Sequence, residues 1–398
     1  TCQLLAGELF PDEVFTNSGL TGRQMQAKAK NMLYDWFVTF RKEGFTEWNS
    51  SPYLPIDTLG FGSLYAFAQD PAMRELGREG MDFAYYLLAV HSQQGIFASS
   101  SGRTYIKEQF GNWSNCPSGL SWIGYGYGVP GHAGKGITSY CLSDYEPPKE
   151  FAQWFSIPRG KEMICQTTQG NDGYVDLYTY KTADYMMTSA NDFHPGEPGH
   201  QENPFQLTFN AVAQLWVTHP GERVLFGAAR PSYWAGNGTL PKVNQYKAFA
   251  GLIYDIAPEH PVDFTHLYLP SMEFDRCEVE GKWAFVQLGS AYAAVYCSNG
   301  MRMQDFGSNK DRECIAEGRR CIWLVRAAQA DEFAAFEDFK AAMRGAALDA
   351  DAEGRRYRFV DPVYGELRCQ WGETLYVNDA PMQYSGFDNY GKLTMQEK

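Results

Sequence analysis

Residues 44–57 contain a mixture of side chains that suits the recognition of a sugar. Glu47, Trp48 and Asn49 stand together there, and Tyr53 follows them. A tryptophan ring can cover the apolar face of a sugar, and amide and carboxylate groups can bind its hydroxyls. We therefore predict that this stretch lines a sugar-binding cleft, with Trp48 and Asn49 contacting the substrate. Trp48 could equally be an anchor of the core, and Glu47 a cap of the following helix.

A second polar group occupies residues 192–203, in a loop rich in glycine and proline that precedes a strand predicted at 206–209. His194, His200 and Glu202 belong to this loop, and such residues are poor material for a core. We predict that they contact substrate or take part in catalysis. Histidine and carboxylate groups can also bind zinc, but their spacing here matches no metal motif. No metal and no cofactor are therefore predicted, and a structural metal is a minor alternative.

Two shorter segments complete the set of candidate residues. Arg103 could hold a carboxylate with its planar guanidinium, or form an ordinary surface salt bridge, and Tyr105 stands two positions later. Trp234 and Asn237 lie in a turn and could line a subsite, although a hairpin turn with a packed tryptophan is the alternative. We predict substrate contacts for all four.

The composition limits the classes of partner and compartment. The chain has 398 residues, a formal net charge of −13 and no dense run of basic residues, so a nucleic-acid partner is not expected. Aromatic residues reach 15%, which suits either carbohydrate binding or an aromatic-rich core. No segment is apolar enough to cross a membrane, so no membrane partner is expected.

Nine cysteines without a metal or disulfide spacing favour reduced thiols in a bacterial cytoplasm, with a periplasmic or secreted location as the alternative. A disulfide between Cys314 and Cys321 is a further possibility, because both flank a predicted hairpin.

Periodicity divides the chain into a helical part, residues 1–147, and a strand-rich part, residues 148–398. Apolar residues at helical spacing predict helices at 22–43, at 55–70 and from Pro71 onward. Short loops between them indicate helical hairpins that form part of an α/α toroid or solenoid, and the helices are too few to close a ring. Residues 111–147 look like a long loop. Alternating strands after residue 150 predict antiparallel sheets, interrupted by one helix at 331–346.

Several of these segments together resemble the heparinase II/III-like polysaccharide lyases, and the resemblance covers almost the whole chain. It rests on residues 5–19, on Gly44-Phe-Thr-Glu-Trp48 with Tyr53, and on Gly102-Arg-Thr-Tyr105. It also rests on Pro195-Gly-Glu-Pro-Gly-His-Gln-Glu202 and on Trp234-Ala-Gly-Asn237. The resemblance implies an α+β multidomain protein, with N-terminal helical hairpins of an incomplete α/α toroid followed by a large antiparallel β-sandwich.

The resemblance also implies an activity, the cleavage of a uronic-acid-containing oligo- or polysaccharide by β-elimination. Tyr53 falls where such lyases carry their acid/base tyrosine, His200 is the best candidate for the histidine that the sheet contributes, and Arg103 would help to neutralise the uronate. Ser101 stands where relatives often have a histidine. The family's Asn-His pair would fall before Thr1, so we expect that N-terminal helices of the toroid are missing from this sequence. A second chain could supply them.

Two other functions stay open. A glycoside hydrolase on a related toroid would need two converging carboxylates, for which Glu47, Asp57, Glu197 and Glu202 are available. A non-catalytic glycan-binding subunit, completed by another chain, is the third possibility.

Overall fold

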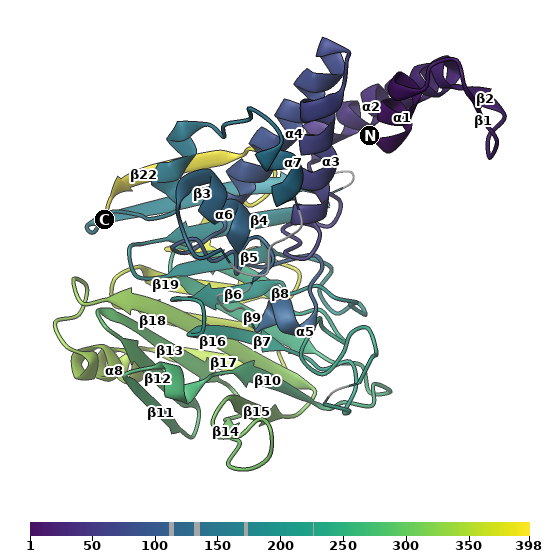
Figure 1. Cartoon of the computed structure of the whole chain (residues 1–398). Helices are drawn as coiled ribbons and strands as arrows, with labels where there is room; N and C mark the ends of the chain where they lie inside the picture. The colour runs from purple at the N-terminus through teal and green to yellow at the C-terminus, as the bar shows by residue number, and fades with distance from the viewer. Residues whose placement is uncertain (111–114, 131–135, 171–173, 226) are drawn as a thin grey trace.

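The computed structural model describes residues 1–110, 115–130, 136–170, 174–225 and 227–398. Helices come first along the chain and strands follow, as Figure 1 shows. The helices of the first part are α1 (Cys2–Leu9), α2 (Gly22–Glu43), α3 (Leu54–Phe67), α4 (Pro71–Val90), α5 (Ile106–Gln109), α6 (Ser118–Tyr125), α7 (Ile137–Cys141) and the 3-10 helix η1 (Lys149–Trp154). A small ribbon of β1 (Val14–Phe15) and β2 (Leu20–Thr21) separates α1 from α2.

Local sequence signals explain where the two long helices begin and end. Thr21 and Gln24 form a reciprocal capping box at the start of α2, and Gly44, with φ of 67°, ends it. Asp70 caps α4 by accepting a hydrogen bond from the backbone N–H of Ala72. The tight turn between α3 and α4 therefore makes them a helical hairpin (Figure 1).

The strand-rich part contains three antiparallel sheets among the described residues. The nine-stranded sheet has the order β14 (Arg302–Met303), β15 (Glu313–Glu317), β10 (Phe264–Tyr268), β7 (Gln214–Thr218), β6 (Phe205–Thr208), β5 (Met186–Asn191), β4 (Val175–Lys181), β3 (Lys161–Gln169) and β22 (Lys392–Glu397). The six-stranded sheet has the order β11 (Arg276–Glu280), β12 (Trp283–Leu288), β13 (Ala291–Cys297), β16 (Arg320–Gln329), β9 (Phe249–Asp255) and β8 (Lys242–Tyr246). The five-stranded sheet runs β17 (Leu348–Asp351), β18 (Arg356–Asp361), β19 (Gly365–Gln370), β20 (Tyr376–Val377) and β21 (Ala380–Pro381).

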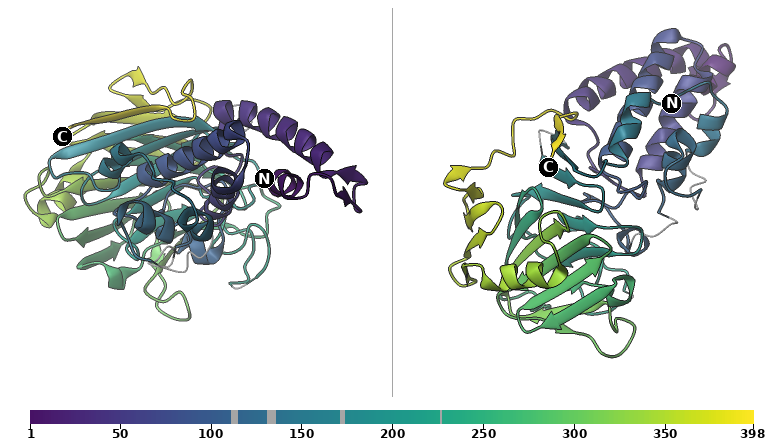
Figure 2. Two further views of the ribbon diagram at one scale, coloured as in Figure 1. Left: turned by 45° about the horizontal axis from the view of Figure 1, so that its top comes forward. Right: turned by 90° about the vertical axis from the view of Figure 1, so that its left-hand side faces the viewer.

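The six-stranded sheet lies between the other two, because side chains alternate across its strand β16. The indole N–H of Trp323 donates to Thr265 Oγ1 on β10 of the nine-stranded sheet, at 2.9 Å. Arg326 is three positions on and binds Asp361 on β18 of the five-stranded sheet, at 2.7 Å. Helix α8 (Phe336–Gly345) and the short helix η2 (Ser271–Glu273) lie beside these layers, and Figure 2 shows the layers from the side.

The helical part packs on the β3–β22 end of the nine-stranded sheet. Its core includes Phe83 and Tyr86 of α4 and continues into Met163 and Cys165 of β3. Buried polar groups also cross this junction, since the ammonium of Lys181 on β4 donates to the carbonyl oxygens of Ala89 and Trp154, at 2.9 and 2.7 Å. These contacts hold the helices at a defined position relative to the sheet.

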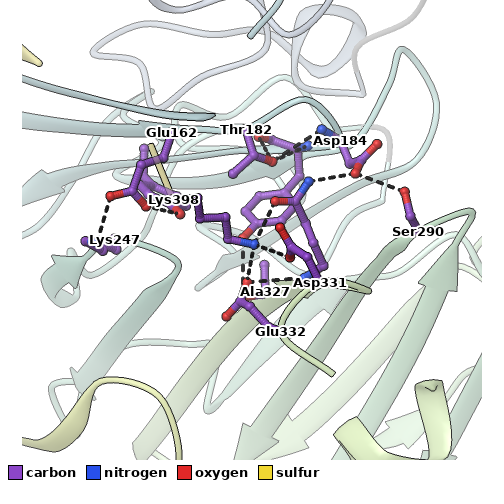
Figure 3. A network of polar contacts seen from close by, with 12 residues as sticks. Glu162, Thr182, Asp184, Lys247, Ser290, Ala327, Asp331, Glu332 and Lys398 are labelled. Carbon is purple, nitrogen blue, oxygen red and sulfur yellow. Dashed lines mark hydrogen bonds and ion pairs between the residues drawn. The ribbon is translucent and has the colours of Figure 1, made fainter. Parts of the chain in front are cut away.

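A polar network joins the nine-stranded and six-stranded sheets (Figure 3). The ammonium of Lys398, just after β22, pairs with Asp331 and Glu332, which follow β16. Glu162 on β3 binds Lys247 in the turn between β8 and β9, at 2.7 Å. The C-terminal strand is therefore tied to both sheets.

The order of helices followed by large antiparallel sheets is confirmed by the structure. The long loop predicted at 111–147 is wrong in part, because α6 and α7 lie within it; Leu120 of α6 is fully buried, and this packing outweighs the high glycine content. The disulfide alternative is also corrected, since Cys321 lies next to Cys297, with their Sγ atoms 3.2 Å apart, and Cys314 contacts Met303. Within the described residues, no helix is long and apolar enough to cross a membrane.

Candidate functional site

Four side chains that the sequence analysis singled out separately meet in one cluster, which we call the tyrosine–arginine cluster: Glu47, Tyr53, Arg103 and Tyr105. The phenolic oxygens of Tyr53 and Tyr105 are 3.2 Å apart. Arg103 Nη2 donates to both, at 3.4 Å to Tyr53 and 3.2 Å to Tyr105, and Arg103 Nη1 binds Glu47 Oε1 at 2.9 Å. All four are partly exposed, so a ligand could reach them.

Backbone hydrogen bonds hold the segments that carry this cluster. Tyr53 stands at the N-terminus of α3, where its N–H donates to the carbonyl of Ser50. The 101–105 segment is joined to the segment that carries Glu47 and Tyr53 by the hydrogen bond from Gly102 N–H to the Trp48 carbonyl, at 2.8 Å. A side chain at position 102 would collide with the indole of Trp48, with its Cβ 2.6 Å from Nε1, which explains why a glycine stands there.

The electrostatics of the cluster separate the two tyrosines. The hydrogen bond from Tyr53, together with the guanidinium of Arg103, lowers the pKa of Tyr105 below its ordinary value. The same hydrogen bond to Tyr105, with desolvation, raises the pKa of Tyr53. The pair thus contains one phenol suited to losing a proton and one suited to keeping it.

Arg230 is a cationic neighbour of the cluster that the sequence analysis missed. Its guanidinium lies 5.6 Å from the centre of the Tyr105 ring, and its side chain is exposed. Its positive charge also contributes to the lowered pKa of Tyr105. The signal that could have found it is its place four residues before Trp234, just ahead of the segment 234–237 that the sequence analysis considered.

An open apolar groove of about 350 Å³ begins one helical turn beyond Tyr53. Trp36 on α2 and Ile56 on α3 line it, with 44% and 41% of their surfaces exposed. Among the described residues, no element covers the exposed part of Trp36. Asp57 also lines the groove, where burial, and next the charge of Glu47, raise its pKa to about 7.

The polar loop at 192–203 meets the 101–105 segment through its last residues. Gln201 and Thr104 exchange hydrogen bonds, with the Thr104 N–H donating to the Gln201 carbonyl at 3.1 Å and the Gln201 side chain donating to the Thr104 carbonyl at 2.8 Å. His200, one position earlier, is exposed, and its backbone N–H donates to the carboxylate of Glu202. This pairing brings His200 and Glu202 beside the 101–105 segment.

His194 has different neighbours from His200. Its imidazole pairs with Glu197, at 3.4 Å, and packs against the rings of Tyr174 and Phe193. The structure therefore separates the two histidines of the loop: His200 stands next to the 101–105 segment, and His194 packs on Phe193, which contacts Trp48.

Four predicted substrate contacts are corrected by their burial. Trp48 is only 1% exposed and packs on Phe193, so its ring is a core anchor and not a sugar platform. Trp234 is equally buried and stacks on His266, with ring centroids 4.2 Å apart. Asn237 is fully buried, where its oxygen accepts from His219 N–H and from Tyr254.

Asn49 is the fourth of these residues and is also buried, with 2% exposure and a positive φ of 48°. Its amide N–H₂ donates to the carbonyl of Ser100, at 3.4 Å, and its oxygen Oδ1 has no hydrogen-bond partner among the described residues. Periodicity and residue type could not foresee this, because a side chain's burial depends on segments far away in the chain.

Within the described ranges, no three histidine, cysteine, aspartate or glutamate side chains converge as they would around a metal ion. Comparison of the chain with protein-family models, with curated proteins and with solved structures found no match. The geometry of the cluster is therefore the basis for assigning a function.

Proposed function

We propose that the protein is a polysaccharide lyase that cleaves a uronic-acid-containing glycan by β-elimination. The observation that carries the proposal is the hydrogen-bonded pair of Tyr53 and Tyr105 with Arg103 bridging both phenols. β-Elimination at a uronic acid needs a base for the proton on C5, an acid for the leaving O4 and a cation for the carboxylate. The tyrosine–arginine cluster offers all three functions within one contact network.

In this mechanism the Tyr105 phenolate removes the C5 proton, because its pKa is the lowered one of the pair. The electrons of the C5–H bond form the C4–C5 double bond, and the C4–O4 bond breaks. Tyr53, whose pKa is raised, donates its proton to O4. Arg103, together with Arg230 near the Tyr105 ring, stabilises the negative charge that moves onto the carboxylate. His200, in the loop that pairs with the 101–105 segment, would contact the sugar.

At the level of the fold, we propose that the helices are a portion of an α/α toroid and that the sheets are the β-sandwich of such a lyase. The hairpin of α3 and α4 and the layered antiparallel sheets support this assignment. We also propose that helices of a second chain cover the apolar groove, because Met32, Trp36 and Ile56 expose more apolar surface than single scattered residues do. Covering Trp36 should shift its fluorescence to shorter wavelength. An unshifted emission in the complex of the two chains would count against the proposal that a second chain covers the groove.

A second candidate is a glycoside hydrolase, and one observation favours it. Asp57, with its pKa raised to about 7, could serve as a general acid, and Glu47 is close enough for its charge to contribute to that shift. Against it, Glu47 is held by Arg103, and Glu197 and Glu202 have separate partners. Hydrolysis and elimination leave different products, since only elimination creates a double bond.

The test is to incubate the protein with a panel of uronate polymers and to follow the ultraviolet absorbance of the unsaturated product. We expect an absorbance rise with at least one polymer, abolished in Tyr53→Phe and in Tyr105→Phe while glycan binding is retained. Tyr34→Phe, which changes an exposed tyrosine of α2, is the matched control and should leave the rate unchanged. New reducing ends without absorbance would select the hydrolase, and binding without either product would select a non-catalytic glycan-binding subunit.

A further inference from the structure

A small cavity adjoins the segments that carry the tyrosine–arginine cluster. Three segments that also carry or support the cluster contribute to its wall: residues 49–51, residues 97–104, and residues 203–214. The short helix α5 closes it with Glu108 and Gln109. Its volume of about 10 Å³ corresponds to a single water-sized particle. The cavity is therefore a site for one small occupant and not a substrate cleft.

Three of the residues that line the cavity carry a side-chain oxygen without a hydrogen-bond partner among the described residues: Asn49 Oδ1, Glu108 Oε2 and Asn203 Oδ1. Their residues are 2%, 6% and 1% exposed. An unpaired polar atom at this depth costs on the order of 1–3 kcal/mol, and more when it carries charge. Three such acceptors around one space indicate that an occupant compensates them.

The number of acceptors distinguishes a water molecule from a cation. A water has two hydrogens, so it can satisfy two of the three oxygens and leaves the third unpaired. A cation attracts all three at once. The amide nitrogen of Gln109 is the unpaired donor of the wall, and turning that amide by half a rotation would present a fourth oxygen instead.

The charge of the wall sets the charge of the occupant. Glu108 is the one acidic side chain that the cavity wall contains, and the other oxygens are neutral amides and hydroxyls. The second oxygen of Glu108 already pairs with the exposed ammonium of Lys107, at 3.1 Å. Tight calcium sites use several carboxylates, whereas one partly neutralised carboxylate matches a single positive charge. We propose that this cavity binds one monovalent cation, Na⁺ or K⁺, through Asn49, Glu108 and Asn203.

The proposed ion would join the segments that position the cluster. Asn49 lies four residues before Tyr53, Ser101 and Thr104 flank Arg103, and Asn203 pairs through its backbone with Ser101. An ion held by these segments would stabilise their mutual arrangement. This inference concerns binding and stability alone, so it holds or fails independently of the proposed lyase activity.

Thermal unfolding in matched salts tests the proposal. At equal ionic strength, we expect a higher unfolding midpoint in sodium or potassium chloride than in choline chloride, whose cation is too large for the cavity. Glu108→Gln should remove this difference. Asp176→Asn is the matched control, because Asp176 is a partly buried carboxylate bonded to Thr168 outside the cavity, and it should preserve the difference. Equal midpoints of the unmodified protein in all three salts would overturn the proposal.

A crystallographic measurement on the unmodified protein needs no variant. Crystals soaked in a thallium(I) salt should show an anomalous peak among Asn49, Glu108 and Asn203, since Tl⁺ replaces K⁺. An ordinary water in that position, without an anomalous peak, would show that the cavity is hydrated and would refute the cation site even if Glu108→Gln failed to fold.

Discussion

The phenolic oxygens of Tyr53 and Tyr105 lie at hydrogen-bond distance, 3.2 Å apart, although 52 positions separate the residues in the chain. Arg103 donates to both oxygens. This relationship brings two candidates of different expected roles, one catalytic and one substrate-binding, into one hydrogen-bonded pair.

The pair makes a prediction about the pH dependence of turnover. We expect kcat/KM to rise with pH as Tyr105 loses its proton, at a pH below the ordinary tyrosine value of about 10, and to fall when Tyr53 loses its own. Because Arg103 contributes to the lowered pKa of Tyr105, Arg103→Met should move the rising limb to higher pH. A rising limb that stays in place in this variant would contradict the assignment of Tyr105 as base.

We predict that Trp48 contributes to the stability of the fold and not to glycan binding. Trp48→Ala should lower the free energy of unfolding by about 3–5 kcal/mol, because it removes a large side chain from a closed core. Denaturant unfolding measures this change. Trp122→Ala is the matched control: its side chain is 46% exposed, so a change within about 0.5 kcal/mol is expected. A stable Trp48→Ala protein that binds glycan poorly would instead support the sugar-platform interpretation.

The ion pairs of Arg326 connect the six-stranded sheet to the five-stranded sheet. Arg326, Asp361 and Glu332 have side chains 3%, 0% and 8% exposed. Arg326→Met would leave the buried carboxylate of Asp361 without its cation, and Glu332 would keep only Lys398. We expect a loss of about 3–5 kcal/mol in the free energy of unfolding. Arg320→Met, which breaks two pairs of a 43% exposed arginine, should cost about 0–1 kcal/mol. Equal losses in the two variants would show that burial does not govern these pairs.

Two buried histidines predict how stability depends on pH. Burial lowers the pKa of both His91 and His219 from 6.5 to about 3. Between these values the unfolded chain binds protons that the folded protein does not, so the free energy of unfolding should fall as pH falls from about 6.5 toward 3. The slope is at most roughly 1.4 kcal/mol per pH unit for each histidine.

His91→Gln should reduce the pH dependence of the free energy of unfolding by the contribution of one histidine. Denaturant unfolding at several pH values measures this change. His200→Gln changes an exposed ring and provides the comparison, with the slope expected to be unchanged. A slope unaffected by His91→Gln would mean that His91 binds its proton equally in the folded and unfolded states, so that burial does not lower its pKa.

Much of the secondary structure could be predicted from the sequence, because it depends on short-range patterns. The helix at 22–43 agrees with its capping residues at both ends, and alternating apolar residues after residue 150 predicted the antiparallel sheets that the structure has. Helices α6 and α7 were missed because glycine-rich segments have weak local preferences, and burial of residues such as Leu120 comes from contacts with other parts of the chain.

By itself, the sequence determined which residue types are available for chemistry and that helices precede antiparallel strands. The tertiary structure decided which candidates share a site: it joined Tyr53, Arg103 and Tyr105, added Arg230, and withdrew Trp48, Trp234 and Asn237 into the core. The physical reason is that a side chain's local preference depends on its neighbours in the chain. Its exposure, its pKa and its partners depend on neighbours in space, which the packing of helices on sheets establishes.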